Sequence, residues 1–178
     1  MVEFHKKKLK NGLTVLFEKR DLPIISIALA TRFGSCYESE KEKGVAHLIE
    51  HMLFKGTKKR SARQISEEIA EKGAEHNAFT AKTFTTAWLK LPSKYLEFSI
   101  ELLSDLFYNS RFDEKEFQKE KGAVLEEIKM YHDTPVRFVF EQLLKLMYKK
   151  PFGLSGLGDS ESVSNISRSK AFEKYKEN

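Results

Sequence analysis

The stretch GVAHLIEHMLF, residues 44–54, places two histidines and one glutamate in an otherwise apolar run. His47 and His51 are four residues apart, so on a helix their side chains lie one above the other and can reach one metal ion. Glu50 falls on the same side of that helix. The stretch therefore predicts a helix that presents two imidazoles and a carboxylate along a single stripe.

Apolar residues fill the remaining directions of this helix, which is typical of a buried helix. Buried ionisable groups need partners, and a metal ion would supply them. The pattern is H-x-x-E-H, the inverted form of the zinc-protease motif H-E-x-x-H. The alternative is a pair of core histidines that are hydrogen-bonded to backbone carbonyls.

A catalytic zinc ion usually has three protein ligands, so a third ligand must lie elsewhere in the chain. The segment FDEKEFQKEKGAVLEEIKMYHD predicts a helix from about residue 113 to 131. Glu120 and Glu127 flank the apolar face of this helix, whereas Glu126 points away from it. Periodicity thus favours Glu127 as the ligand, and the alternative is that both flanking glutamates are solvated. The apolar face consists of Phe117, Val124, Ile128 and Tyr131.

The other potential ligands show no comparable spacing. His5, His76 and His132 are isolated in the sequence. Cys36 lies in the loop-like stretch CYESEKEKG and is interpreted as a bystander.

These motifs together resemble the pitrilysin family of zinc peptidases, which includes insulin-degrading enzyme and the mitochondrial processing peptidase. The resemblance begins with HLIEH and the distant glutamate in EKGAVLEEIKMYHDTP. LKNGLTVLFEKRDLPIISIALATRFGSCYE resembles the opening strands of that family, and HNAFTAKTFTTAWLKLP resembles its substrate-binding strand. The similarity extends along nearly the whole chain.

The resemblance implies a role for each matching residue. His47, His51 and Glu127 would bind Zn²⁺, and Glu50 would act as the general base. Glu120 matches a second family glutamate, seven residues before the ligand. It would support the metal site without binding the metal itself. The function implied is that of a zinc-dependent endopeptidase that hydrolyses peptide bonds in peptides or unfolded segments.

Substrate binding and assembly are also implied by the resemblance. Asn77 and Ala78 would help to hold the backbone of a peptide substrate. Family subunits commonly contain two similar halves, and residues 1–178 resemble the first half only. The resemblance therefore implies that a second half-domain or a partner subunit, as in a dimer, completes the active enzyme.

Two other functions remain open from the sequence. The chain could be a non-catalytic peptide-binding or assembly module that needs a second half-domain or partner for activity. It could also be a structural zinc domain, in which case four protein ligands would close the site.

Composition excludes several classes of protein. The 178 residues suit one domain with a substantial core. The net charge of +5 arises from 31 basic residues interspersed with 26 acidic ones, which does not favour nucleic-acid binding. The single cysteine fits a reducing compartment. We see no apolar signal-peptide core near Met1 and no apolar stretch long enough to span a bilayer, so we expect a cytoplasmic protein without a membrane segment.

The order of elements predicts an α+β fold in which helices pack on one face of a mostly antiparallel sheet. A hairpin is expected around Asn11-Gly12, and a buried strand over residues 24–33. Ser61 and Gln64 predict a capping box for a helix that ends at Gly73. Two strands are expected within residues 74–91.

Two further helices complete the expected fold. The first runs over about residues 92–108 and has a core face that consists of Tyr95, Phe98, Leu102 and Leu106. The second runs over residues 136–148, after an interruption at Pro135. Its apolar residues are expected in the core, namely Phe138, Leu143, Leu144 and Met147.

Overall fold

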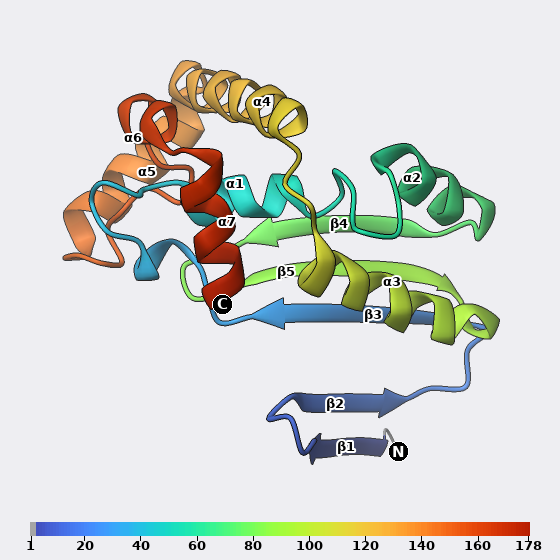
Figure 1. The fold of residues 1–178 in the computed structure, drawn as a ribbon. Coiled ribbons are helices and arrows are strands. Elements are labelled where there is room, and N and C mark those ends of the chain that lie inside the picture. Colours follow the sequence, from blue (N-terminus) through green and yellow to red (C-terminus); the bar gives the residue numbers. More distant parts are fainter. Residues whose placement is uncertain (1–2) are drawn as a thin grey trace.

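The computed structural model describes residues 3–178, and within them the strands form two antiparallel sheets (Figure 1). Met1 and Val2 lie outside the described residues. The larger sheet has the order β3-β5-β4, and the smaller sheet is the hairpin β1-β2. The strands are β1 (Glu3–Lys8), β2 (Thr14–Lys19), β3 (Ile24–Thr31), β4 (Glu75–Thr80) and β5 (Thr85–Pro92).

Among residues 3–178, two α-helices lie between β3 and β4 in the chain, and five follow β5. Two short 3-10 turns, Ser35–Tyr37 and Ser93–Tyr95, connect larger elements. The α-helices are α1 (Val45–Met52), α2 (Ala62–Glu71), α3 (Leu96–Asn109), α4 (Glu114–Asp133), α5 (Pro135–Met147), α6 (Ser160–Asn165) and α7 (Arg168–Glu177).

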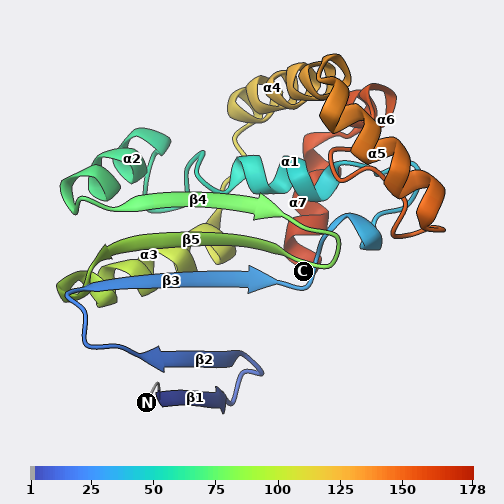
Figure 2. The same ribbon diagram turned by 180° about the vertical axis from the view of Figure 1, so that it is seen from behind.

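The helices cover one side of the larger sheet. In Figures 1 and 2, α3 and α7 lie on the same side of β3 and β5. Helix α1 contacts β4 and β5 on one flank and α4 and α7 on others. The fold is therefore the two-layer α+β arrangement that the sequence predicts, and its buried core lies between the sheet and these helices.

Strand β3 is less buried than expected. Alternate residues along it are exposed, and Ile24 retains 45% of its accessible surface. Ile25, Ile27 and Leu29 pack against the core, while the residues between them face away from the helices. The prediction of a fully buried strand was wrong because helices cover only one face of the sheet, and alternate side chains point to the other.

Helix α5 also differs from the prediction, because none of its residues is buried. Phe138, Leu143, Leu144 and Met147, which were expected in the core, are 36%, 45%, 38% and 64% exposed. The helix packs chiefly against α4. Periodicity correctly indicates that α5 has an apolar face. It does not determine whether other residues of the same chain pack against that face.

Several local signals are confirmed. Ser61 and Gln64 form a reciprocal capping box at the start of α2. Gly73 ends that helix with a φ of 61°, a left-handed conformation that favours glycine. Pro135 is the first residue of α5, where its missing N–H has no cost.

The core positions of α3 and α4 largely agree with periodicity. Leu102, Leu106 and Phe117 are each fully buried. Tyr95 and Phe98 are partly buried and pack against the same core. These contacts hold α4 in place above α1, so the core also determines where the glutamates of α4 lie.

We expect Leu102→Ala to lower the free energy of unfolding by about 2–5 kcal/mol, since it leaves a cavity at a position with 0% exposure. For a chain of this size the melting temperature should fall by roughly 4–20 °C. Thermal unfolding followed by circular dichroism measures this. Leu146→Ala is the matched control, because Leu146 is 86% exposed and should change stability by less than about 0.5 kcal/mol. Equal effects of the two variants would contradict the assigned core.

No helix among residues 3–178 combines the length and the apolar character that crossing a membrane requires.

Candidate metal centre

Helix α1 is almost entirely buried, in agreement with its sequence. Val45, Ala46 and Leu48 are each at most 1% exposed, and His47 is 7% exposed. The end of the helix is also held, because the Ser110 hydroxyl donates to the Leu53 carbonyl at 3.3 Å. The imidazoles of α1 are thus presented by a helix that the surrounding core immobilises.

The structure brings His47 and His51 of α1 together with Glu127 of α4. One ligand atom from each of the three lies within 4.8 Å of the others. The Nε2 atom of each imidazole is 3.6 Å from Oε2 of Glu127. Glu126, by contrast, is exposed and pairs with Lys129. Among residues 3–178, these three are the one group found with metal-ligand spacing.

The spacing of these atoms fits a metal ion better than direct hydrogen bonds. A separation of 3.6 Å is too long for an N–H···O bond. Ligand atoms about 2.0–2.1 Å from a tetrahedral zinc ion are themselves roughly 3.3–3.4 Å apart. Two imidazoles and one carboxylate also form a ligand set that occurs in catalytic zinc sites.

The protonation states of two of the three candidate ligands also suit a metal centre. Burial, followed by the nearby His51, lowers the pKa of His47 to about 4, so its imidazole is neutral at pH 7. The facing imidazole of His51, and then the charges of His47 and His51, hold the pKa of Glu127 below its ordinary value despite partial burial. Metal ligands must be deprotonated, and both groups meet that condition.

Glu120 is buried behind His51 and is not a solvated flank residue. It is 6% exposed, and its Oε2 lies 3.1 Å from Nδ1 of His51. Lys55 lies 2.7 Å from its other oxygen. Burial alone would raise the pKa of Glu120, but Lys55 and His51 together keep it below the ordinary value. A carboxylate here can hold Nδ1–H of His51 and leave Nε2 free toward Glu127.

Glu50 lies beside these residues and is tied to β4. The Thr80 hydroxyl donates to Oε2 of Glu50 at 2.7 Å. Burial is the largest effect on its pKa and raises it, while His51 opposes the increase and Glu127 adds to it. A carboxylate with a raised pKa is suited to accept a proton near neutral pH.

Sequence reasoning missed the residues that hold these carboxylates. Thr80 ends β4 and Lys55 follows α1, so neither belongs to the motif. Arg137 of α5 also contributes to the low pKa of Glu127. Only Lys55 carries a recognisable signal, because it follows His51 by four residues and continues the same face.

Asn77 and Ala78 lie on β4, at the edge of the larger sheet. Asn77 is exposed, and its side-chain oxygen accepts the N–H of Ala78 at 2.8 Å. Ala78 is half-buried and packs against the core. The pair therefore lies on the strand that ends at Thr80, the residue that binds Glu50.

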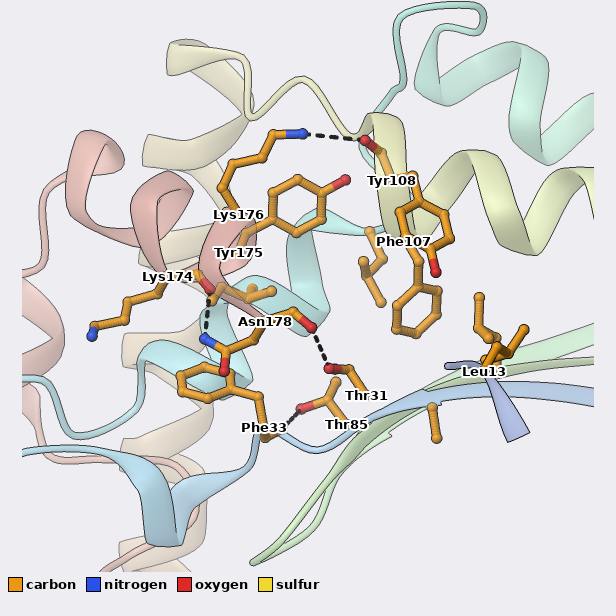
Figure 3. A pocket seen from close by; sticks show the side chains of 14 residues that line it. Leu13, Thr31, Phe33, Thr85, Phe107, Tyr108, Lys174, Tyr175, Lys176 and Asn178 are labelled. Atoms are coloured by element: carbon orange, nitrogen blue, oxygen red, sulfur yellow. Dashed lines mark hydrogen bonds between the residues drawn. The ribbon is translucent and has the colours of Figure 1, made fainter. Parts of the chain in front are cut away.

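A cavity of about 270 Å³ lies on the other side of α1 (Figure 3). Its lining includes Ile49 and Leu53, which point away from the two histidines. Asn178 lies at its rim, where its backbone oxygen accepts from the Thr31 hydroxyl at 2.7 Å. The candidate metal centre is therefore separate from this largely apolar cavity.

Residues 14–160 match the family model described as insulinase, peptidase family M16. The chain belongs to this family. The M16 chain is 38% identical over 167 residues to an uncharacterized zinc protease of Rickettsia felis, covering 93% of this chain and 40% of that protein. It is also 38% identical to the mitochondrial-processing peptidase subunit beta of Rattus norvegicus, over 90% of this chain and 33% of that protein.

Solved structures show the same fold. A protease from Helicobacter pylori matches with a TM-score of 0.92 at 24% identity, over 98% of this chain and 43% of that chain. A domain from Pseudomonas fluorescens, described as an inactive M16 peptidase domain, matches with a TM-score of 0.88 at 21% identity, over 97% and 43%. The M16 chain thus spans well under half the length of these relatives.

Proposed function

We propose that this chain is the zinc-binding half of an M16 metalloendopeptidase that hydrolyses peptide bonds in peptides or unfolded segments. The observation that carries the proposal is the convergence of His47, His51 and Glu127, with the carboxylate of Glu50 beside them. Three protein ligands, and not four, are what a catalytic zinc site requires. This favours the enzyme over a structural zinc domain.

Zinc at this site would activate a water molecule and polarise the scissile carbonyl. Glu50 would accept the proton of the attacking water and pass it to the leaving amine. Its burial raises its pKa, which favours proton uptake, and the Thr80 hydroxyl fixes one of its oxygens. Glu50 needs no direct bond to the metal for this role.

Glu120 would act through His51 and not on the substrate. Its contacts with Nδ1 of His51 and with Lys55 fix the orientation of the imidazole ring. Such outer partners typically change metal affinity or activity by about 10–100-fold when they are removed. Glu120 is thus proposed as a positioning residue for the metal site.

An extended peptide would bind along the edge of β4. The strand pairs with β5 on one side and is the terminal strand of its sheet. Backbone hydrogen bonds to an added strand give affinity with modest sequence preference. Asn77 and Ala78 would hold the substrate backbone there, on the same strand as Thr80, which contacts Glu50.

A second half-domain or partner subunit would complete the enzyme. The chain covers 40% of the Rickettsia felis relative, and α5 exposes Val139, Phe140 and Leu146 at 62%, 63% and 86%. Exposed apolar surface of this kind commonly marks an interaction site. Because α5 follows directly from the helix that carries Glu127, a partner on α5 would also approach the metal centre.

We therefore expect residues 1–178 alone to cleave a fluorogenic peptide at least about 100-fold more slowly than an assembly that includes the second half, because misplaced substrate is costly in rate. Comparison of kcat/KM for the two preparations, both loaded with zinc, measures this. Activity of the assembly should disappear with a chelator and return with zinc. Equal rates would mean that this half is a self-sufficient protease.

The second candidate function is a non-catalytic peptide-binding or assembly module. The inactive M16 domain from Pseudomonas fluorescens shares the fold, so the fold by itself does not establish activity. A zinc-loaded assembly that binds peptides without cleaving them would favour this alternative.

A further inference from the structure

The N-terminal end of α1 lacks a capping side chain of its own. Its N-cap residue is Gly44, which has a φ of 90°. A Cβ atom at this position would lie 2.5 Å from the Leu157 carbonyl oxygen and 2.8 Å from Cγ2 of Val163. The serine, threonine or aspartate that usually caps a helix is therefore excluded here, and the free N–H groups must find another partner.

Glu38 supplies that partner from six residues upstream. Its Oε2 accepts the N–H of Gly44 at 2.9 Å, and its Oε1 accepts the N–H of Ala46 at 2.8 Å. The residue is only 7% exposed. A carboxylate at a helix N-terminus also interacts favourably with the helix dipole. Glu38 thus does, from outside the helix, what an N-cap side chain would do.

The segment that carries Glu38 is itself anchored to the turn between β4 and β5. The N–H of Ser35 donates to the Ala81 carbonyl at 3.2 Å, and the N–H of Cys36 donates to the Lys82 carbonyl at 2.8 Å. This turn directly follows Thr80, which binds Glu50. Glu38 and Thr80 therefore tie two points of α1 to the same end of the sheet.

We propose that Glu38 is a positioning residue for the metal site, which fixes the first turn of α1 and thereby the imidazole of His47. The proposal rests on the zinc function proposed above. Ala46, whose N–H Glu38 accepts, directly precedes His47. A helix of eight residues is marginal by itself, so loss of this contact should loosen the turn that presents the ligand.

The competing interpretation is that Glu38 only stabilises the fold. In that case its replacement destabilises the metal-free and metal-loaded protein equally, and zinc affinity of the folded protein does not change. A positioning role instead weakens zinc binding and alters the geometry of the bound metal. Metal affinity and the metal spectrum therefore separate the two interpretations.

The test compares Glu38→Gln with the parent chain at pH 8. This pH ensures ionisation, since burial, opposed by the Ala46 and Gly44 N–H groups, raises the pKa of Glu38 to about 7. Zinc affinity is measured by competition with a chromogenic chelator, and the visible spectrum is recorded with Co²⁺ in place of zinc. We expect about tenfold weaker zinc binding and a changed Co²⁺ spectrum.

Glu42→Gln is the matched control, because its carboxylate binds the Ser39 hydroxyl at 2.7 Å and Lys170, and caps no N–H of α1. This variant should bind zinc within about twofold of the parent affinity. A change in folding stability alone does not alter the zinc affinity of the folded protein. Parent-like affinity and spectrum in a folded Glu38→Gln would overturn the proposal. If that variant does not fold, Glu38→Asp replaces it in the test. Aspartate keeps the charge but is too short to reach both N–H groups, so zinc affinity and the Co²⁺ spectrum of this variant test the same proposal. Absence of zinc binding by the parent chain would instead refute the proposed function.

Discussion

Glu50→Gln should abolish peptide cleavage by the complete assembly while leaving zinc bound. The amide has the same shape as the carboxylate and can still accept the Thr80 hydroxyl, so the local structure should persist. An amide cannot take a proton from water near neutral pH, and the loss of a general base costs about 10²–10⁴-fold in rate. Steady-state kcat together with metal analysis of the same sample measures both halves of this expectation.

The control for this variant is Glu67→Gln, which changes an exposed glutamate of α2 that pairs with Arg63. Its rate and zinc content should match those of the parent protein. Substantial cleavage by a zinc-replete Glu50→Gln assembly would refute the role assigned to Glu50. Loss of zinc from that variant would instead indicate that Glu50 is itself a ligand.

Glu127→Gln should lose zinc. The carboxylate of Glu127 is the acidic ligand that faces both Nε2 atoms at 3.6 Å, and a neutral amide is a much poorer ligand for Zn²⁺. We expect affinity to fall by more than the roughly 100-fold that loss of an outer partner can cost. Metal analysis after dialysis against a weak chelator measures the effect.

Glu126→Gln provides a closely matched control for this experiment. Glu126 is the adjacent residue on α4, but its side chain pairs with Lys129 at the surface. Zinc content should not change in this variant. Undiminished zinc in Glu127→Gln, with loss in Glu126→Gln, would show that the wrong carboxylate has been assigned.

Local pattern in the sequence determined much of the fold and of the candidate site. The i, i+4 spacing of His47 and His51 placed both imidazoles on one face of α1, and periodicity selected Glu127 over Glu126. Helix geometry alone decides such relationships, because they depend on the direction of side chains within one element. The capping signals at Ser61 and Gly73 were equally local.

Tertiary structure decided which apolar faces are covered. The sequences of β3 and α5 both contain enough apolar residues for a core, yet β3 is only partly buried on one face and α5 has no buried residue. Burial depends on what packs against an element, and in this chain the helices lie on one side of the sheet only (Figures 1 and 2). No periodicity within a segment contains that information.

Tertiary structure also decided how the charged residues are supported. Thr80 binds Glu50 across 30 residues of chain, and Glu120 binds His51 across 69. Glu38 caps α1 because close packing against Leu157 leaves no room for a side chain at Gly44. Local pattern can name the residues that carry the chemistry, but only the folded chain brings together the distant groups that hold them, since a buried charge is stable only where such partners converge.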